Sequence, residues 1–185
     1  MNPNVVLIQC GNRSDGFSVS MGMALSLRLD GTLSHLNLYD CSPEMIAASV
    51  RDSDVVAFAC PVFSSEIVQS FWDLMPFLHV ENKIGVLIVA SGRSSFFCRD
   101  SIKKAMNALR SSGFAPAVSI IVDNTYGLVK GEFSSKHLRH LDKALKTIRI
   151  RWFRPHLFTL RDSFKFVSII FLSWSILWTP SSLKE

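Results

Sequence analysis

The chain lacks the features that mark several common classes of protein. Its four cysteines include no CxxC pair of the kind that builds zinc sites and thioredoxin-type redox sites. The first residues, Met1–Asn4, carry neither the basic region nor the long apolar run of a signal peptide. We therefore expect a cytoplasmic protein with reduced thiols and no metal site.

Basic residues are sparse outside one segment. The net charge is +5, and it comes entirely from Lys146, Arg149, Arg151, Arg154, Arg161 and Lys165, offset by Asp162. The rest of the chain is close to neutral, which argues against a nucleic-acid-binding domain, because such a domain spreads basic residues over a face. His137 and His140 lie three apart on a predicted helix without an evident third ligand, so we interpret them as part of a solvated helix face.

Five apolar runs rich in β-branched residues predict strands. Most are continuous rather than alternating, which is typical of strands buried on both faces of a parallel sheet. The second run alternates more and is expected at an edge. The runs are Val5–Gln9, His35–Tyr39, Asp54–Ala59, Lys83–Ala90 and Ala117–Val122.

Helical patterns separate these runs. Ser42 and Pro43 predict the cap and first turn of a short helix through Val50. Apolar residues three or four apart predict the others, with Pro76 and Gly113 ending two of them. The stripes are Met21, Leu25 and Leu29; Ile67, Phe71, Leu74 and Met75; Ile102, Ala105, Met106 and Leu109; and Leu138, Leu141, Leu145 and Ile148, the last after a cap at Ser134 or Ser135.

Strict alternation of strands and helices predicts right-handed crossovers and helices on both faces of one sheet. Five such units match a flavodoxin-like α/β three-layer sandwich, with a five-stranded parallel sheet in the order 2-1-3-4-5. In that order a ligand sits outside the carboxyl ends of the strands, where the order reverses. The loops after strands one, three and four are therefore the candidate binding loops.

The first loop combines glycine, hydroxyl and basic residues at the start of a helix. Gly11 lets the backbone approach an anion, Ser14 and Ser18 offer hydroxyls, and Arg13 can pair with phosphate oxygens. Asp15 is unfavourable there and is expected to point away. The loop is neither a Walker loop nor a GxGxxG motif, and an ordinary capped turn explains it about equally well.

The other two loops are suited to a flat ring. Pro61 fixes the chain direction after strand three, Phe63 offers an aromatic surface, and Ser64 follows. Taken alone, this segment is better explained as a hydrophobic plug with a serine cap. The loop after strand four, 91–97, is small and polar and ends in two aromatic residues. The interpretation of these three loops as one binding site is strengthened because the predicted topology brings them to one place.

At these loops the chain resembles the NADPH-dependent FMN reductase family of flavodoxin-like proteins. The likeness is nearest to the flavin reductases that supply alkanesulfonate monooxygenases, and it covers Val5 to Ile150. The segments that carry it are Arg51–Phe63, Gln69–Pro76, Val89–Gly92 and Ile121–Asn124, with the first loop and the final helix.

The resemblance implies an NAD(P)H-dependent FMN reductase with FMN as cofactor and a nicotinamide nucleotide as co-substrate. Gly11, Arg13, Ser14 and Ser18 would hold the FMN phosphate; Pro61, Val62, Phe63 and Ser64 would line the flavin; and Ser91 and Gly92 would meet its edge. No catalytic side chain is implied, because hydride passes from nicotinamide to flavin and the protein supplies geometry and electrostatics. Arg93 departs from the family, which usually has a second glycine there, so its side chain could obstruct the nicotinamide face or grip an anion.

Residues 151–185 form a basic and then apolar tail beyond the predicted domain, residues 1–150. Its run Phe166–Trp178 has only serines as polar residues and is shorter than the roughly 20 residues of a membrane-spanning helix. We expect this run to cover a homo-oligomer contact or the domain itself, with attachment to a membrane surface as the second interpretation and a tail that is not a selected structure as the third.

Two other functions compete with the reductase. One is a flavodoxin-like electron carrier that binds FMN without reducing it from nicotinamide, and the other is a structural relic of such a protein with no cofactor. Flavin absorbance and NADPH oxidation separate the three.

Overall fold

The computed structural model describes residues 2–126, 128–129 and 132–152. Five strands form a parallel sheet: β1 (Asn4–Gln9), β2 (Thr32–Asn37), β3 (Val55–Phe63), β5 (Ile84–Ala90) and β6 (Ala117–Val122). Their order is β2-β1-β3-β5-β6, and a short strand β4 (Glu66–Ile67) pairs antiparallel with the end of β3. The flavodoxin-like sheet predicted from the strand–helix alternation is confirmed.

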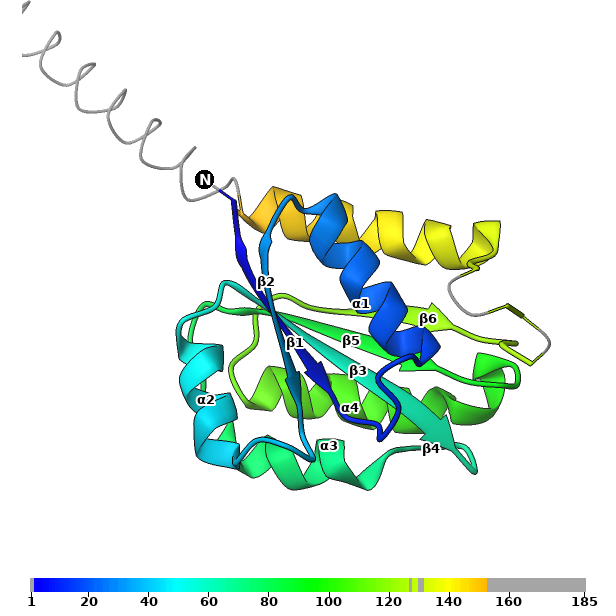
Figure 1. Cartoon of the computed structure of the whole chain (residues 1–185), viewed down its shortest axis with the longest axis horizontal. Coiled ribbons are helices and arrows are strands. Elements are labelled where there is room, and N and C mark those ends of the chain that lie inside the picture. The colour runs from blue at the N-terminus through cyan, green and yellow to red at the C-terminus, as the bar shows by residue number, and fades with distance from the viewer. Residues whose placement is uncertain (1, 127, 130–131, 153–185) are drawn as a thin grey trace, which may run out of the picture. The chain divides into compact units, whose positions relative to one another are not determined.

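Helices cover both faces of this sheet (Figure 1). The helix α1 (Phe17–Arg28) and a helix over residues 135–152 lie on one face, and α2 (Pro43–Arg51), α3 (Gln69–Leu74) and α4 (Arg99–Ser111) lie on the other. Two short 3-10 helices, Met75–Phe77 and Ser95–Cys98, precede β5 and α4 respectively.

The alternation of buried side chains along the strands explains these layers. In β1, Leu7 joins a core cluster with Leu25 of α1 and Leu145 of the last helix. Ile8 joins a second cluster with Ile46 of α2 and Phe71 of α3. Successive strand residues face opposite sides of a sheet, so a continuous apolar run supplies both clusters.

Several helix ends were predicted correctly. Ser42 caps α2 by accepting a hydrogen bond from the Met45 backbone N–H at 3.3 Å, with Pro43 in the first turn. Gly113 follows α4 in a left-handed conformation, φ +95°, as expected for a glycine beyond a helix end. The helix predicted to end at Pro76 does not end there, because α3 continues into a 3-10 helix that contains this proline. Proline fits the first turn of such a helix, where its missing N–H costs nothing.

Two strands differ by more than one residue from their predicted bounds. β2 occupies Thr32–Asn37 rather than 35–39, because β1 pairs with it from Asn4 opposite Thr32 to Gln9 opposite Asn37. β3 continues beyond Ala59 to Phe63, since β5 pairs with it as far as Pro61 and β4 pairs with its last two residues.

The chain divides into two units, Met1–Ile148 and Arg149–Glu185. The predicted tail run, 166–178, lies outside the described residues. In the part of the chain that is described, no helix combines the length and the apolar character needed to cross a membrane.

Candidate functional site

The first loop and the end of β3 are in direct contact at the carboxyl edge of the sheet. A Cβ atom at Gly11 would lie 2.7 Å from Cγ of Pro61, so the close approach of the two segments requires glycine. The buried Gln9 amide donates to the Gly11 carbonyl at 2.8 Å. Its Oε1 has no hydrogen-bond partner within the described structure, which leaves a buried acceptor beside the loop.

The N-terminus of α1 lies directly after this loop. Its cap residue, Gly16, provides no side-chain hydrogen bond, and the first turn contains no acidic residue. Such a helix end presents backbone N–H groups and positive potential. Of the predicted phosphate ligands, Ser14 is exposed, whereas Ser18 is buried in the first turn.

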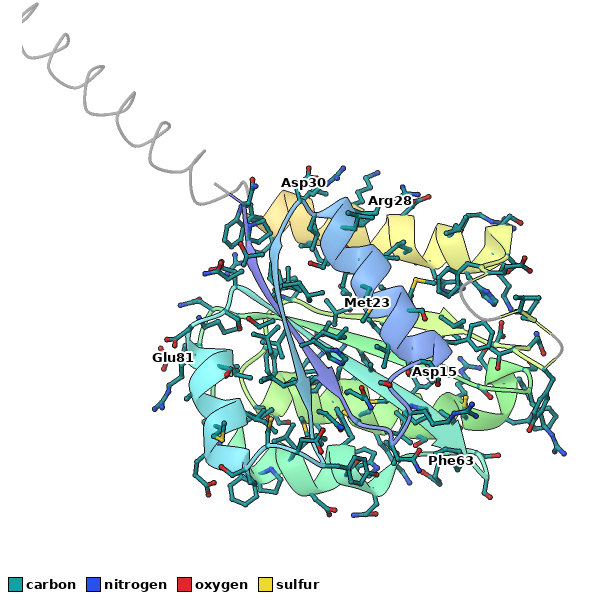
Figure 2. The ribbon with its side chains drawn as sticks, viewed as in Figure 1. Asp15, Met23, Arg28, Asp30, Phe63 and Glu81 are labelled. Atoms are coloured by element: carbon teal, nitrogen blue, oxygen red, sulfur yellow. The ribbon has the colours of Figure 1, made fainter. Side chains whose placement is uncertain are left out.

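Arg13 and Asp15 form an ion pair, with 3.5 Å between Nε and Oδ1. Both side chains are mostly exposed, and Asp15 lies at the start of α1 (Figure 2). Asp15 therefore does not simply point away from the loop, as expected, but partly neutralises the arginine predicted to bind phosphate.

A cavity of about 300 Å³ opens beside the ends of β3 and β5. It contains four of the residues predicted to contact a flat ring: Val62, Ser64, Ser91 and Gly92. Ser65, Arg93, Phe97, Cys98 and Tyr126 complete its lining.

Pro61 and Phe63 do not line this cavity. Pro61 contacts Gly11 instead, which ties the first loop to β3. Phe63 is 60% exposed at the outer end of β3 (Figure 2). Neighbouring residues of a strand face opposite sides, so Val62 and Phe63 cannot both face the cavity.

The turn between β3 and β4 holds the cavity wall in an unusual conformation. Ser64 and Ser65 have φ values of +49° and +71°, in the left-handed region that glycine and asparagine adopt more readily. Two such residues form the tight turn whose twist suits an antiparallel hairpin. The hairpin thus fixes two hydroxyl-bearing residues at the edge of the cavity.

Tyr126 is a lining residue that the sequence analysis missed. A Cβ atom at Gly92 would lie 2.5 Å from Cζ of Tyr126, so the tyrosine ring lies against this glycine. The two loops are also joined by backbone bonds: Thr125 N–H donates to Ser91 O at 3.2 Å and Asn124 N–H to Arg93 O at 3.1 Å. A signal was present, because β6 neighbours β5 in the predicted order and its following loop must lie beside 91–97.

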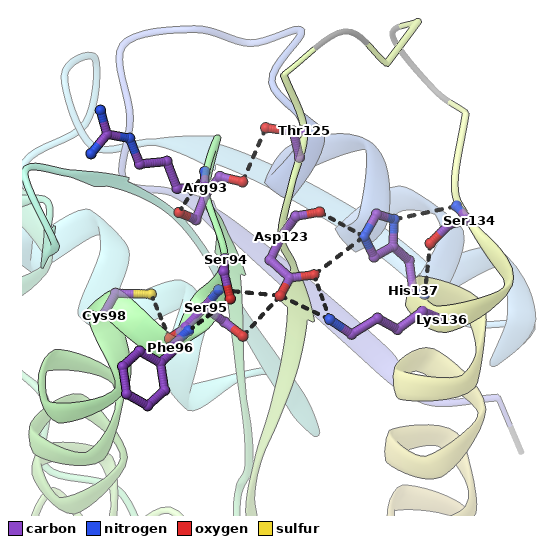
Figure 3. A network of polar contacts seen from close by, with 11 residues as sticks. Arg93, Ser94, Ser95, Phe96, Cys98, Asp123, Thr125, Ser134, Lys136 and His137 are labelled. Atoms are coloured by element: carbon purple, nitrogen blue, oxygen red, sulfur yellow. Dashed lines mark hydrogen bonds and ion pairs between the residues drawn. The ribbon is translucent and has the colours of Figure 1, made fainter.

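Behind the cavity, Asp123 connects three segments (Figure 3). Its buried carboxylate accepts hydrogen bonds from the Ser95 N–H at 3.1 Å, the Ser95 hydroxyl at 2.9 Å and the Lys136 ammonium at 2.9 Å. Burial raises the pKa of Asp123, but the bonds from Lys136 and Ser95 outweigh burial and hold that pKa below its ordinary value. The ionised carboxylate fixes the 91–97 loop to the last helix.

His137 belongs to the same junction and is buried, so its interpretation as part of a solvated face was wrong. Its Nδ1 accepts from the Ser134 N–H at 3.3 Å, and its Nε2 therefore donates to the Asp123 carbonyl at 2.9 Å. Ser134 Oγ accepts from the His137 N–H at 3.4 Å, which confirms Ser134 as the cap of the last helix.

Cys10 and Cys60 are both buried free thiols. Burial is the main cause that raises the pKa of Cys60 well above its ordinary value, and a hydrogen bond with Cys10 raises it further. A thiol that resists ionisation is a poor nucleophile. The interpretation of these residues as inert is thereby supported.

The fold is that of a flavodoxin-like α/β protein. Solved structures with the same fold include an NADH:FMN oxidoreductase in its apo form, with a TM-score of 0.66, 14% identity and coverage of 80% of this chain and 89% of that chain. For an FMN-dependent NADH-azoreductase from Bacillus anthracis in complex with FMN, the TM-score is 0.60 and the identity 11%, with coverage of 80% of this chain and 98% of that chain. For an NAD(P)H:quinone oxidoreductase from Methanothermobacter marburgensis, the TM-score is 0.54 and the identity 13%, with coverage of 80% of this chain and 96% of that chain.

No protein-family model matches the chain, and no curated protein matches it by sequence. At these identities, the structural likeness establishes the fold, and the function has to be argued from the site.

Proposed function

We propose that this protein binds FMN at the carboxyl edge of its sheet and reduces it with NAD(P)H. One observation carries the proposal: the Gly11–Pro61 contact joins an uncapped helix N-terminus to a cavity lined by Val62, Ser64, Ser91 and Gly92. A phosphate-bearing flat ring needs an anion site and a pocket next to each other. Solved structures of the same fold include enzymes named for FMN and nicotinamide chemistry.

The residues present fit that cofactor. The Gly11–Ser14 loop, Arg13 and the start of α1 would hold the phosphate, since backbone N–H groups at a helix N-terminus favour anions. Gln9 Oε1 lacks a donor, which a ligand hydroxyl could supply. Val62, Ser64, Ser91 and Gly92 would hold the ring, and bound FMN would supply hydride acceptance.

The protein's own part in the reaction is then positioning. The Asp123 junction holds the 91–97 loop, and the β3–β4 hairpin holds the opposite wall. No side chain of the site is required as an acid or base. We further propose that the reduced flavin serves a flavin-dependent partner enzyme of the monooxygenase type.

An electron carrier is the second candidate, and one observation favours it. The ring of Tyr126 lies against Gly92 within the cavity, where it could cover a flavin and leave less room for nicotinamide. Such a protein would bind FMN but would not oxidise NAD(P)H.

Titration with FMN and riboflavin, followed by flavin fluorescence, tests the binding step. We expect FMN to bind more tightly than riboflavin, because only FMN carries the phosphate. NADH and NADPH oxidation with excess FMN then tests catalysis. FMN binding without oxidation of either nucleotide would favour the carrier, and recovery of FAD alone from the protein would contradict both.

A further inference from the structure

Among the described residues that line the cavity, Arg93 alone carries a charge. Its backbone is held on both sides, since its N–H donates to Ser91 Oγ at 3.3 Å and its carbonyl accepts from the Asn124 N–H at 3.1 Å. Its side chain is exposed and extends away from the Asp123 junction (Figure 3). Arg93 therefore presents a cationic side chain from a backbone that is fixed at the cavity wall.

No carboxylate in the described part of the chain pairs with this guanidinium. Asp123, which lies behind the same loop, is already bonded to Lys136 and Ser95. The remaining lining residues are uncharged, and several are serines. A ligand in this cavity consequently meets one uncompensated positive charge.

Two aromatic rings line the same cavity as Arg93. Phe97 is 63% exposed and Tyr126 is 79% exposed, although both line the cavity. Flat ligands stack on such rings, and a guanidinium binds carboxylate, sulfonate or phosphate oxygens through paired N–H groups. A cavity of about 300 Å³ is at the small end of ligand pockets, so a second ligand beside the proposed flavin would be a compact ring at the exposed lining residues Arg93, Phe97 and Tyr126.

We propose that Arg93 makes this site selective for a second substrate that carries an oxyanion next to a flat ring. The inference rests on the proposed function and specifies its substrate class. The oxyanion has two possible sources, an acidic electron acceptor or the extra phosphate that distinguishes NADPH from NADH. When a quinone is the electron acceptor, NAD(P)H and a proton convert it to its hydroquinone and leave NAD(P)⁺, whichever substrate carries the oxyanion.

Matched pairs of substrates test the proposal. The FMN-loaded protein is assayed with 1,4-naphthoquinone-2-sulfonate against 1,4-naphthoquinone, and with NADPH against NADH. Arg93→Gln removes the charge and Arg93→Lys keeps it. Arg99→Gln is the control, because Arg99 is also exposed but lines a different cavity.

We expect Arg93→Gln to raise KM about 3- to 10-fold for the sulfonated quinone if the acceptor supplies the anion, or for NADPH if the nucleotide does. KM for the uncharged quinone and for NADH should stay within about twofold, and Arg93→Lys should retain most of the preference. Equal effects on both members of each pair, or the same effect from Arg99→Gln, would overturn the proposal.

Binding without turnover separates this inference from the proposed function. 2-Naphthalenesulfonate and 2-naphthalenesulfonamide are titrated by calorimetry into protein with and without FMN. A sulfonate preference that disappears in Arg93→Gln supports the anion site even if the protein proves not to reduce flavin. FMN binding with neither a sulfonate preference nor an NADPH preference that Arg93→Gln removes refutes the role of Arg93 and leaves the proposed function standing.

Discussion

Arg13 and Asp15 offer opposite charges to the same anion. They form an exposed ion pair in the first loop, with 3.5 Å between Nε and Oδ1. A phosphate placed at the start of α1 would attract Arg13 away from Asp15 and would be repelled by Asp15. Their two substitutions should therefore act in opposite directions.

The first prediction concerns this pair. Arg13→Ala should weaken FMN binding by about 1 kcal/mol, since an exposed charge that already has a partner contributes modestly. Asp15→Asn should strengthen FMN binding by a few-fold, because it removes the like charge. Fluorescence titration measures both, and riboflavin is the control. Equal effects on FMN and riboflavin would show that the loop substitutions act through folding.

Burial raises the pKa of Asp123, and the hydrogen bond from Lys136 is the first among the causes that lower it. The folded-state pKa of Asp123 is lowered, so its ionised form contributes stability above its unfolded pKa of about 3.9. That contribution is lost as pH falls through the lower folded-state pKa. The contribution of Asp123 to the free energy of unfolding should consequently be lost below about pH 4, on the acid limb of the stability curve.

The second prediction is that Lys136→Met destabilises the protein by about 1–2 kcal/mol at pH 7, because a buried carboxylate loses a charged hydrogen-bond donor. Burial then raises the pKa of Asp123, so the loss of stability on acidification should begin at a higher pH than in the wild type. Urea unfolding between pH 3 and 7 measures this shift. Lys146→Met, an exposed change on the same helix, should leave the acid limb in place.

At the scale of elements, the loop after β1 and the end of β3 depend on each other. Gly11→Ala would place a Cβ 2.7 Å from Cγ of Pro61 and should push the two segments apart. Overpacking of this kind typically costs 1–3 kcal/mol. We predict a loss of affinity of about tenfold or more for FMN and a similar loss for riboflavin, measured by fluorescence titration.

Gly16→Ala is the matched control for that change. Its added Cβ would meet only the Arg13 carbonyl at 3.4 Å, and Gly16 has a φ of −72° that alanine accepts. If both alanine variants bind flavin like the wild type, the Gly11–Pro61 contact does not shape the site.

The strands predicted well from sequence are those whose ends are marked by the local sequence itself. β6 was predicted with its observed bounds, because its strand–loop boundaries coincide with changes in hydrophobicity. β2 was shifted, because an edge strand with mostly exposed residues carries a weak apolar signal and takes its register from β1. The extension of β3 through Pro61 depends on β4 and β5, which local sequence does not reveal.

The lining of the candidate cavity agrees in part with the residues expected at a flat ring, and the binding of a ligand there stays a prediction. Topology identifies the loops that meet, so Val62, Ser64, Ser91 and Gly92 were placed together. Topology does not say which side chain of a loop turns inward. Phe63 therefore was expected in a cavity that it does not line, and Tyr126 was overlooked although Gly92 accommodates its ring.

At the scale of the whole molecule, the last described helix supplies residues to the core. Ala144, Leu145 and Ile148 are buried against α1 and the sheet. A chain that ends at Trp152 keeps all of them. A chain that ends at Lys143 loses all three, with an expected cost of several kcal/mol.

The fourth prediction follows for the tail. Removal of residues 153–185 should leave a folded protein that binds FMN, whereas removal of residues 144–185 should cause unfolding. We propose that the full chain is a homodimer and the shorter one a monomer, as measured by sedimentation. A full-length protein that is monomeric and does not bind anionic vesicles would contradict both the dimer and the membrane-surface interpretation of the tail.

The burial of the cysteines has a practical consequence for probing the protein. Cys10, Cys60 and Cys98 are at most 2% exposed, and burial raises the pKa of both Cys60 and Cys98, whereas Cys41 is partly exposed between β2 and α2. Alkylation requires an accessible thiolate. A maleimide dye should thus modify the native protein at Cys41 alone, and mass spectrometry should show one adduct before denaturation and four after it. That single attachment point lies outside the lining of the candidate cavity, so a fluorophore there could report ligand binding without substituting any cysteine.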